Sequence, residues 1–279
     1  MNSFYMTLLS DSSVQHFPNN TQSSFRTKLP KAIDINKGEW EMAMVEMIHP
    51  AQVYNVSKEE SQFHLSTSYK GLVQKLLELH PPKCEKLESG DIVYPMCIPA
   101  GVYNSPEHLV NEINDTIQKT IGESLKKVNC LFEIQYSNLS KRIKFGRKAK
   151  YDITLAFHPG LLAKLGASNQ NRISVDNDEA FTHDVDLYAG INHMFIYSDL
   201  ADFTLLGDVQ APILRVVPFQ DSKQIHVHKE FLNLHYVPVS KPYFDEIGIN
   251  IRGDTGEIIQ FSGGKSMVKL HFRKKTQYL

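Results

Sequence analysis

Strict alternation of apolar and polar side chains near the C-terminal end constrains the fold of this chain more than any other feature. The segments EIGINIRG (246–253) and MVKLHFRK (267–274) both place an apolar residue at every second position. A two-residue period puts these side chains on one face of a β-strand. Both segments are therefore predicted to be antiparallel strands, with Ile247, Ile249, Ile251, Val268, Leu270 and Phe272 on the buried face.

Several other segments have strand-like composition and are separated by polar, Pro-bearing or Gly-bearing loops. They lie at residues 40–50, 193–199, 211–219 and 231–239, and a shorter one lies between two Gly-rich turns with Ile259 and Phe261 facing inward. Many short strands with hardly any helix among them are typical of a sandwich or a jelly roll. The chain is therefore predicted to be mainly β.

The middle of the chain has a helical period instead. Ser105 is a predicted N-cap and Pro106 a predicted first helical residue, before apolar residues at helical spacing and a terminating Gly122. Strand-like runs at 130–137, 141–145 and 151–156 and a short helix at 159–166 follow. We therefore predict an α+β insertion domain over residues 68–187, between two parts of one β-sandwich, residues 26–67 and 188–279.

The N-terminal 25 residues form a polar, Pro-bearing run that ends at an isolated Phe25. Two interpretations remain open for this region. Residues 1–25 form an extended arm that docks elsewhere, or residues 25–29 are the first strand of the chain's own sandwich. Extended arms lose conformational entropy when they dock but gain a large contact area.

Composition excludes several classes of protein. The 279 residues are 42% hydrophobic and 22% charged with a formal charge of −1, which is typical of a globular protein and not of a dedicated nucleic-acid binder. No basic flank precedes an apolar core near the N-terminus, so we expect no secretory signal and synthesis in the cytosol. No apolar run is long enough to span a bilayer, and we expect no membrane contact. Cys84, Cys97 and Cys130 are expected to be free thiols.

Motifs that carry catalysis are missing from the sequence. There is no HExxH, GxSxG, GxxxxGK[ST], GxGxxG or CxxC. His226 and His228 could face the same way, but without a third ligand nearby a solvent-exposed strand face is favoured over a metal site. We therefore predict that the chain is not an enzyme and has no cofactor, no metal and no catalytic residue.

Three charged segments allow a binding and a structural interpretation. The run KRIKFGRKAK (141–150) either contacts a phosphate backbone or forms a hairpin with Ile143 and Phe145 inward, and the basic tail after residue 271 offers the same choice. Arg252, Gly253 and Asp254 match the tripeptide that integrins recognise. The Thr255-Gly256 that follows also predicts an ordinary β-turn, so the turn is favoured and a receptor-binding turn is the alternative.

Six segments in order resemble the minor capsid, or penton, proteins of Polinton (Maverick) elements and adintoviruses. They are residues 17–47, 99–114, 156–168, 191–200, 205–219 and 244–275. The resemblance implies a single jelly roll with an α+β insertion. It also implies a structural virion protein that forms a homopentamer at the icosahedral capsid vertices of a double-stranded DNA virus or virus-like transposon.

Partners and contact residues follow from the same resemblance. The expected neighbours are double jelly-roll major capsid proteins, and the basic segments are expected to make weak contact with packaged DNA. The arm would run along a neighbouring subunit or beneath the major capsid capsomers, with Phe17 and Phe25 as apolar anchors. Backbone groups there would pair with Asn19, Asn20 and Ser24. Aromatic residues are enriched at the centres of interfaces, but they also fill the space between sheets. The interface candidates, each with this alternative, are Phe17, Phe25, Trp40, Tyr54, Tyr197, Phe219 and Tyr243.

A second hypothesis is a host-type β-sandwich that binds a ligand or a carbohydrate, because jelly rolls also serve lectins and cupins. A cupin would supply clustered His and Glu metal ligands, and a lectin would carry a secretory signal. Neither feature is found in this sequence.

Overall fold

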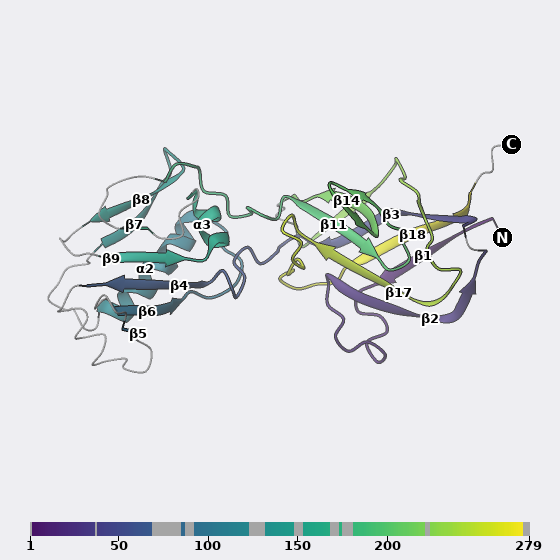
Figure 1. Ribbon diagram of the computed structural model, residues 1–279, viewed down its shortest axis with the longest axis horizontal. Coiled ribbons are helices and arrows are strands. Elements are labelled where there is room, and N and C mark those ends of the chain that lie inside the picture. Colours follow the sequence, from purple (N-terminus) through teal and green to yellow (C-terminus); the bar gives the residue numbers. More distant parts are fainter. Residues whose placement is uncertain are drawn as a thin grey trace. The chain divides into compact units, whose positions relative to one another are not determined.

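The computed structural model describes residues 2–36, 38–68, 85–86, 92–122, 132–147, 153–167, 173–174, 181–220 and 224–275. The chain divides into two compact units. Unit 1 is Met1–Val53 with Gly190–Leu279, and unit 2 is Tyr54–Ala189. Antiparallel strands dominate both units (Figure 1), which confirms the prediction of a mainly β protein.

Unit 1 is built from two antiparallel sheets. The first contains β1 (Ser3–Leu9), β18 (Met267–Lys274), β3 (Trp40–Pro50) and β15 (His226–Glu230), with β16 (Val237–Pro238) also on β3. The second contains β14 (Ile213–Pro218), β11 (His193–Ser198), β17 (Tyr243–Arg252) and β2 (Ser24–Asp34). Counted in chain order, the eight long strands run 1-8-3-6 in one sheet and 2-7-4-5 in the other. This is the strand order of a jelly roll, as predicted.

The core of unit 1 lies between these sheets and follows the predicted alternation. In β18, Val268, Leu270 and Phe272 are buried while the residues between them are not. The ring of Phe272 stacks on Phe4 with centroids 4.8 Å apart, and Phe244 of the other sheet lies 6.1 Å away. Every second residue of these strands thus faces the opposite sheet.

The predicted extended arm over residues 1–25 is wrong. β1 pairs with β18 from Ser3↔Arg273 to Leu9↔Met267, and β2 already begins at Ser24. Phe25 is a core residue. The physical reason is that SFYMTLL itself alternates, so Phe4, Met6 and Leu8 turn toward the core side of the sheet. The second interpretation, in which Phe25 belongs to a strand of its own sandwich, is the one that the structure adopts.

Two predicted strands of unit 1 differ from the structure. Residues 231–239 contribute only the two-residue β16 to the ladder on β3, and the longer strand on this side of β3 is β15, which comes before them. Ile259 and Phe261 are buried as predicted, but the segment forms isolated bridges at Ile258 and Phe261 and no strand. In both segments a few apolar side chains contact the core without a regular backbone ladder.

A small hairpin interrupts the connection between β11 and β14. It consists of β12 (Thr204–Leu206) and β13 (Val209–Ala211), joined by Gly207 and Asp208. Gly207 has a φ of +63°, which a two-residue hairpin turn requires and glycine adopts at low cost.

Unit 2 is an α+β unit, as predicted. Its sheet contains β10 (Ile173–Ser174), β9 (Ile153–Phe157), β4 (Gln62–Thr67), β6 (Ile92–Cys97) and β5 (Glu85–Lys86). A separate hairpin contains β7 (Phe132–Ser137) and β8 (Arg142–Arg147), and the helices are α2 (Pro106–Gly122) and α3 (Pro159–Leu165). The unit begins at Tyr54 and not at residue 68, because β4 pairs on both sides with strands of unit 2.

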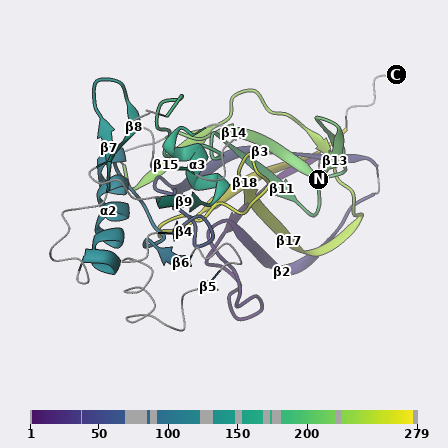
Figure 2. The same cartoon turned by 60° about the vertical axis from the view of Figure 1, so that its left-hand side comes forward.

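Both helices of unit 2 begin and end as the sequence predicts. The Ser105 hydroxyl accepts a hydrogen bond from the His108 N–H at 3.2 Å, and α3 starts at Pro159 and is followed by Gly166 with a φ of +84°. Leu109, Ile113 and Ile117 are buried in the core of the unit. The hairpin lies beside α2 in Figure 2 and is tied to it, since the Asn114 amide exchanges two hydrogen bonds with the Ile134 backbone.

An ion pair is buried in unit 2. The Lys164 ammonium contacts the Glu60 carboxylate, and the two side chains are only 4% and 17% exposed. The other Glu60 oxygen accepts a hydrogen bond from the Ser57 N–H at 2.9 Å, and the Ser57 hydroxyl accepts one from the Glu60 N–H at 3.2 Å. Glu60 therefore joins its own turn to α3.

Candidate functional site

Catalytic and metal-binding groups do not gather in the part of the chain that the structure describes. In those residues no three His, Cys, Asp or Glu side chains are placed to hold a metal ion. His228 bonds Glu46 at 3.0 Å. Cys97 is an exposed free thiol, while Cys84 and Cys130 lie outside the described residues. Over the same described ranges, no helix is both long and apolar enough to cross a membrane.

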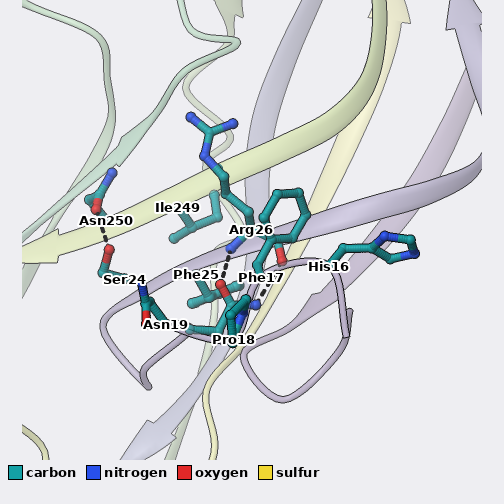
Figure 3. Close-up of a pocket in the computed structure, with 11 residues that line it drawn as sticks. His16, Phe17, Pro18, Asn19, Ser24, Phe25, Arg26, Ile249 and Asn250 are labelled. Atoms are coloured by element: carbon teal, nitrogen blue, oxygen red, sulfur yellow. Dashed lines mark hydrogen bonds between the residues drawn. The ribbon is translucent and has the colours of Figure 1, made fainter. Parts of the chain in front are cut away.

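A pocket of about 370 Å³ lies on the outer face of the second sheet of unit 1, between residues 16–20 and strands β2 and β17. Figure 3 shows Asn19 on the same side as the hydrogen-bonded Ser24 and Asn250, with Phe17 and Pro18 to the right of them. Gly248 lines the pocket and adds no side chain to it. The pocket thus joins an aromatic ring to neutral amides and a hydroxyl.

Residues 10–23, which we name the capping segment, bond the outer edge of β2. Asn20 accepts a hydrogen bond from the Arg26 N–H at 2.9 Å and donates one to the Arg26 carbonyl at 2.8 Å. Thr21 bonds both backbone groups of Ser24. The Ser13 hydroxyl accepts the Lys28 N–H at 2.9 Å. Asn20 was expected to pair backbone groups at a docking site of the arm, but in this structure its partners belong to strand β2 of its own chain.

An ion-pair network covers the same face beside the pocket. Arg26 lies 2.7 Å from Glu246 and 3.2 Å from Asp199, and Asp199 also accepts the Gly248 N–H at 2.8 Å. The hydrogen bond between Lys28 and Asp245 raises the pKa of the ammonium and lowers the pKa of the carboxyl. Because Arg26 is already paired with two carboxylates, the pocket holds no unpaired guanidinium for an anionic substrate.

A second hollow, of about 520 Å³, lies in unit 2 between β4, β6 and α2. Its polar lining residues include His64, Cys97 and Thr116. The described lining offers no pair of side chains in hydrogen-bond contact that would act as nucleophile and base.

The predicted interface residues separate into three groups by burial. Phe25 and Trp40 are buried in the core, so they cannot serve as surface contacts. For these two residues the structure adopts the core alternative that the sequence had left open. The ring of Trp40 lies 5.6 Å from that of Phe4. Half-buried positions hold Phe17, Tyr197 and Phe219, and exposed positions hold Tyr54 and Tyr243.

Sequence reasoning missed several strongly exposed apolar side chains of unit 1. Leu232 is 93% and Leu205 79% exposed, and Phe203 and Val209, close to Leu205 in the chain, are also exposed. Residues 200–202, which lead into the hairpin, are joined to the loop 231–242 by two backbone bonds of 2.9 Å, from the Asp202 N–H to the Pro238 carbonyl and from the Ser240 N–H to the Leu200 carbonyl. We name five exposed apolar side chains of this region, the hairpin and the start of β17 the apolar end; they are Phe203, Leu205, Val209, Leu232 and Tyr243. The signal in the sequence was the apolar FTLL immediately before the turn residues Gly207 and Asp208.

Arg252, Gly253 and Asp254 form a turn whose polar groups are used within the fold. The Asp254 carboxylate accepts the Asn192 N–H at 2.6 Å and bonds the His193 ring at 2.9 Å. The Arg252 guanidinium donates to the Gly256 carbonyl at 2.7 Å. This geometry favours the structural turn over a receptor ligand.

The basic segments have the inward and outward faces of ordinary strands. Ile143 and Phe145 are buried in the β7–β8 hairpin, as the hairpin interpretation predicts. Arg142 pairs with Asp184 at 3.5 Å, and Arg273 pairs with Glu41 at 2.7 Å while its guanidinium lies 3.4 Å from the centre of the Tyr236 ring. Residues 148–150 and 276–279 lie outside the described residues.

No protein-family model matches the chain, and no curated protein matches it. Two solved structures are similar to it along almost its entire length. One is the mavirus penton protein, with 11% identity over 99% of this chain and 100% of that chain and a TM-score of 0.49. The other is a chain of the Sputnik virophage structure, with 11% identity over 99% of this chain and 98% of that chain and a TM-score of 0.43.

Proposed function

We propose that this chain is a structural virion protein, the penton of a double-stranded DNA virus or virus-like transposon. The observation that carries the proposal is the complete jelly-roll strand order of unit 1, with unit 2 inserted between its third and fourth long strands. The six segments that resemble Polinton and adintovirus pentons supply elements of both units. The described residues add no catalytic or metal site that would suggest an enzyme.

A homopentamer at the capsid vertex needs a ring of heterologous contacts, in which one flank of each copy meets the other flank of the next. The apolar end supplies the apolar centre that such a contact requires. Tyr243 is the interface candidate from the sequence that belongs to it. In this proposal the remaining neighbours are double jelly-roll major capsid proteins, the chain is made in the host cytosol, and its final location is the virion vertex.

The proposal is tested by co-expressing the full chain with a double jelly-roll major capsid protein from the same genome, where one is found, and imaging the particles. We expect five copies at each vertex. Leu205→Asp with Leu232→Asp should abolish incorporation, because each carboxylate would be buried at the ring contact. Leu139→Asp, at an exposed apolar position of unit 2, is the matched control and should incorporate normally.

Particles with five-fold vertices that lack this chain would contradict the proposal. A monomer that binds glycans and never joins particles would instead support the hypothesis of a carbohydrate-binding sandwich.

A further inference from the structure

The strand β1 forms one edge of the first sheet of unit 1, and only β18 pairs with it. The bonds that flank this ladder run from the Lys274 N–H to the Asn2 carbonyl at 3.0 Å and from the Ser10 N–H to the Ser266 carbonyl at 2.9 Å. Hydrogen-bonded pairs alternate along an antiparallel ladder, so the even-numbered residues of β1 face β18. The N–H and C=O groups of Ser3, Tyr5 and Thr7 therefore point to the open side. In the described part of the chain nothing bonds them.

The side chains of β1 make this edge suitable for another strand. Tyr5 is 62% exposed, and Ser3 and Thr7 are exposed with it on the outer face. Phe4 and Met6 are half-buried on the core side, so a further strand would cover apolar surface there. The segment SFYMTLL has no charge and no proline. An uncharged, apolar edge strand is a ready template for pairing with another chain.

The other three edges of the two sheets are closed by their own residues. The capping segment and Pro30 block β2. β15 carries His226, His228, Lys229 and Glu230, and the edge strand β14 ends at Pro218, whose carbonyl accepts a bond from Lys229 at 2.7 Å. Charges and prolines on edge strands prevent pairing between molecules. In the described part of unit 1, β1 is the one edge without such a block.

We propose that β1 pairs antiparallel with β1 of a second copy of this chain. With the two-fold axis at Tyr5, Ser3 lies opposite Thr7 of the second copy, and every one of the three pairs can exchange both backbone hydrogen bonds. On the core side Phe4 meets Met6 of the second copy, so the register is self-complementary. The result is an isologous dimer in which the first sheet continues from one copy into the other.

This inference does not rest on the proposed function, because a two-fold contact cannot close a ring of five. Its failure and the failure of the proposed function are therefore distinguishable. A β1 variant that no longer forms dimers but still enters the capsid vertices would show that the β1 contact is separate from the proposed function.

Association of the full chain, measured by light scattering after size-exclusion chromatography and by analytical ultracentrifugation, tests the proposal. We expect dimers whose fraction rises with concentration. Thr7→Pro removes an N–H on the open side and leaves the ladder to β18 intact, so the dimer should weaken roughly tenfold by losing one bond at each end. Thr7→Val keeps the N–H and should dimerise like the natural chain. Trp40 fluorescence confirms that both variants are folded.

A cysteine at the proposed axis locates the contact. Opposed residues of a hydrogen-bonded pair have Cα atoms about 5.5 Å apart, within reach of a disulfide. Tyr5→Cys should give a covalent dimer on mild oxidation, with the bond between the two residues at position 5 identified by peptide mapping. Ile225→Cys, exposed elsewhere on unit 1 and outside the apolar end, should not do so at the same rate. A monomeric natural chain, a Thr7→Pro variant that associates normally, or no link at position 5 would each overturn the proposal.

Discussion

The two units of this protein have apolar cores of the same kind, but they treat charged and polar side chains in opposite ways. Unit 2 buries the Lys164–Glu60 ion pair. Unit 1 keeps its ion pairs at the surface, where the side chains of Arg26 and Glu246 are 42% and 40% exposed, and buries a histidine. Exposed pairs contribute little because solvent screens them, whereas one partner of a buried pair is costly to leave alone. The two units should therefore fail under different perturbations.

The buried histidine of unit 1 is His49, at the end of β3. Its Nδ1 lies 2.8 Å from the Pro50 carbonyl, and its Nε2 has no partner among the described residues. Burial lowers the pKa of His49, and the nearby Lys229 and His226 of β15 lower it further. Its ring lies 5.5 Å from that of Phe261. Unit 1 thus depends on a histidine that stays neutral, and unit 2 depends on a lysine that stays paired.

The largest effect is expected from Glu60→Ala in unit 2. This change leaves the buried Lys164 ammonium without its carboxylate and should lower the free energy of unfolding of unit 2 by about 3–5 kcal/mol. Hydrogen exchange of α3 should accelerate, while the fluorescence of Trp40, the only tryptophan and a residue of unit 1, should keep its unfolding midpoint. The double variant Glu60→Leu with Lys164→Met replaces the pair by apolar groups and should be close to neutral. Equal loss in both units would contradict the contrast.

An intermediate effect is expected when the edge of β2 is uncovered in unit 1. Asn20→Ala removes the two bonds to Arg26 and the one to the Ser12 carbonyl, and should lower the free energy of unfolding of unit 1 by about 1–3 kcal/mol. The midpoint followed by Trp40 fluorescence should fall. Asn19→Ala, at the exposed neighbouring position, is the matched control and should leave the midpoint unchanged. If both variants behave alike, the capping segment does not hold β2.

The smallest effect is a dependence of unit 1 on pH. Because the pKa of His49 is lower in the folded than in the unfolded chain, the unfolded state binds the proton first. Stability is therefore complete above the unfolded pKa of about 6.5 and falls as pH decreases toward the folded value, by at most about 1.4 kcal/mol per pH unit. Urea unfolding followed by Trp40 fluorescence, repeated at several pH values from above 6.5 downward, measures this loss of stability.

His49→Gln should reduce that slope without abolishing it. His271, whose pKa is lowered by burial and by Arg273, contributes over the same range. The pKa values of Asp11 and Asp245 are also lowered, by their bonds to Lys265 and Lys28, but these groups act only at more acidic pH. If the free energy of unfolding of His49→Gln depends on pH as steeply as that of the natural chain, His49 does not cause the pH dependence.

Most of unit 1 and both helices of unit 2 could be predicted from local patterns. The alternation in β17 and β18 identified the buried residues, because one face of each strand is covered by the opposite sheet. The helices α2 and α3 were predicted to within a residue, since Ser105, Pro106, Pro159 and Gly166 are local signals of helix ends. Such signals need no knowledge of the rest of the chain.

Apart from β1, whose own alternation is a local signal that was missed, the errors share one physical cause, which is that the deciding contacts lie far away in the sequence. The capping segment has no alternation of its own, and its polar side chains matter only because β2 lies beside them. β4 was assigned to the sandwich because a strand pattern does not say which strands will pair with it. The open edge of β1, the buried Lys164 and the apolar end likewise follow from tertiary neighbours.

The loop that joins β17 to β18 touches both places where the chain passes between the units. Val53 pairs with Phe261, and the Gly190 carbonyl accepts the Asp254 N–H at 3.2 Å. The last residue of unit 1 before the insertion and the first residue after it are thus both bonded by the β17–β18 loop, which belongs to unit 1. Evolution could exchange the whole inserted module for another of different size or specificity, and the sandwich itself would need no redesign.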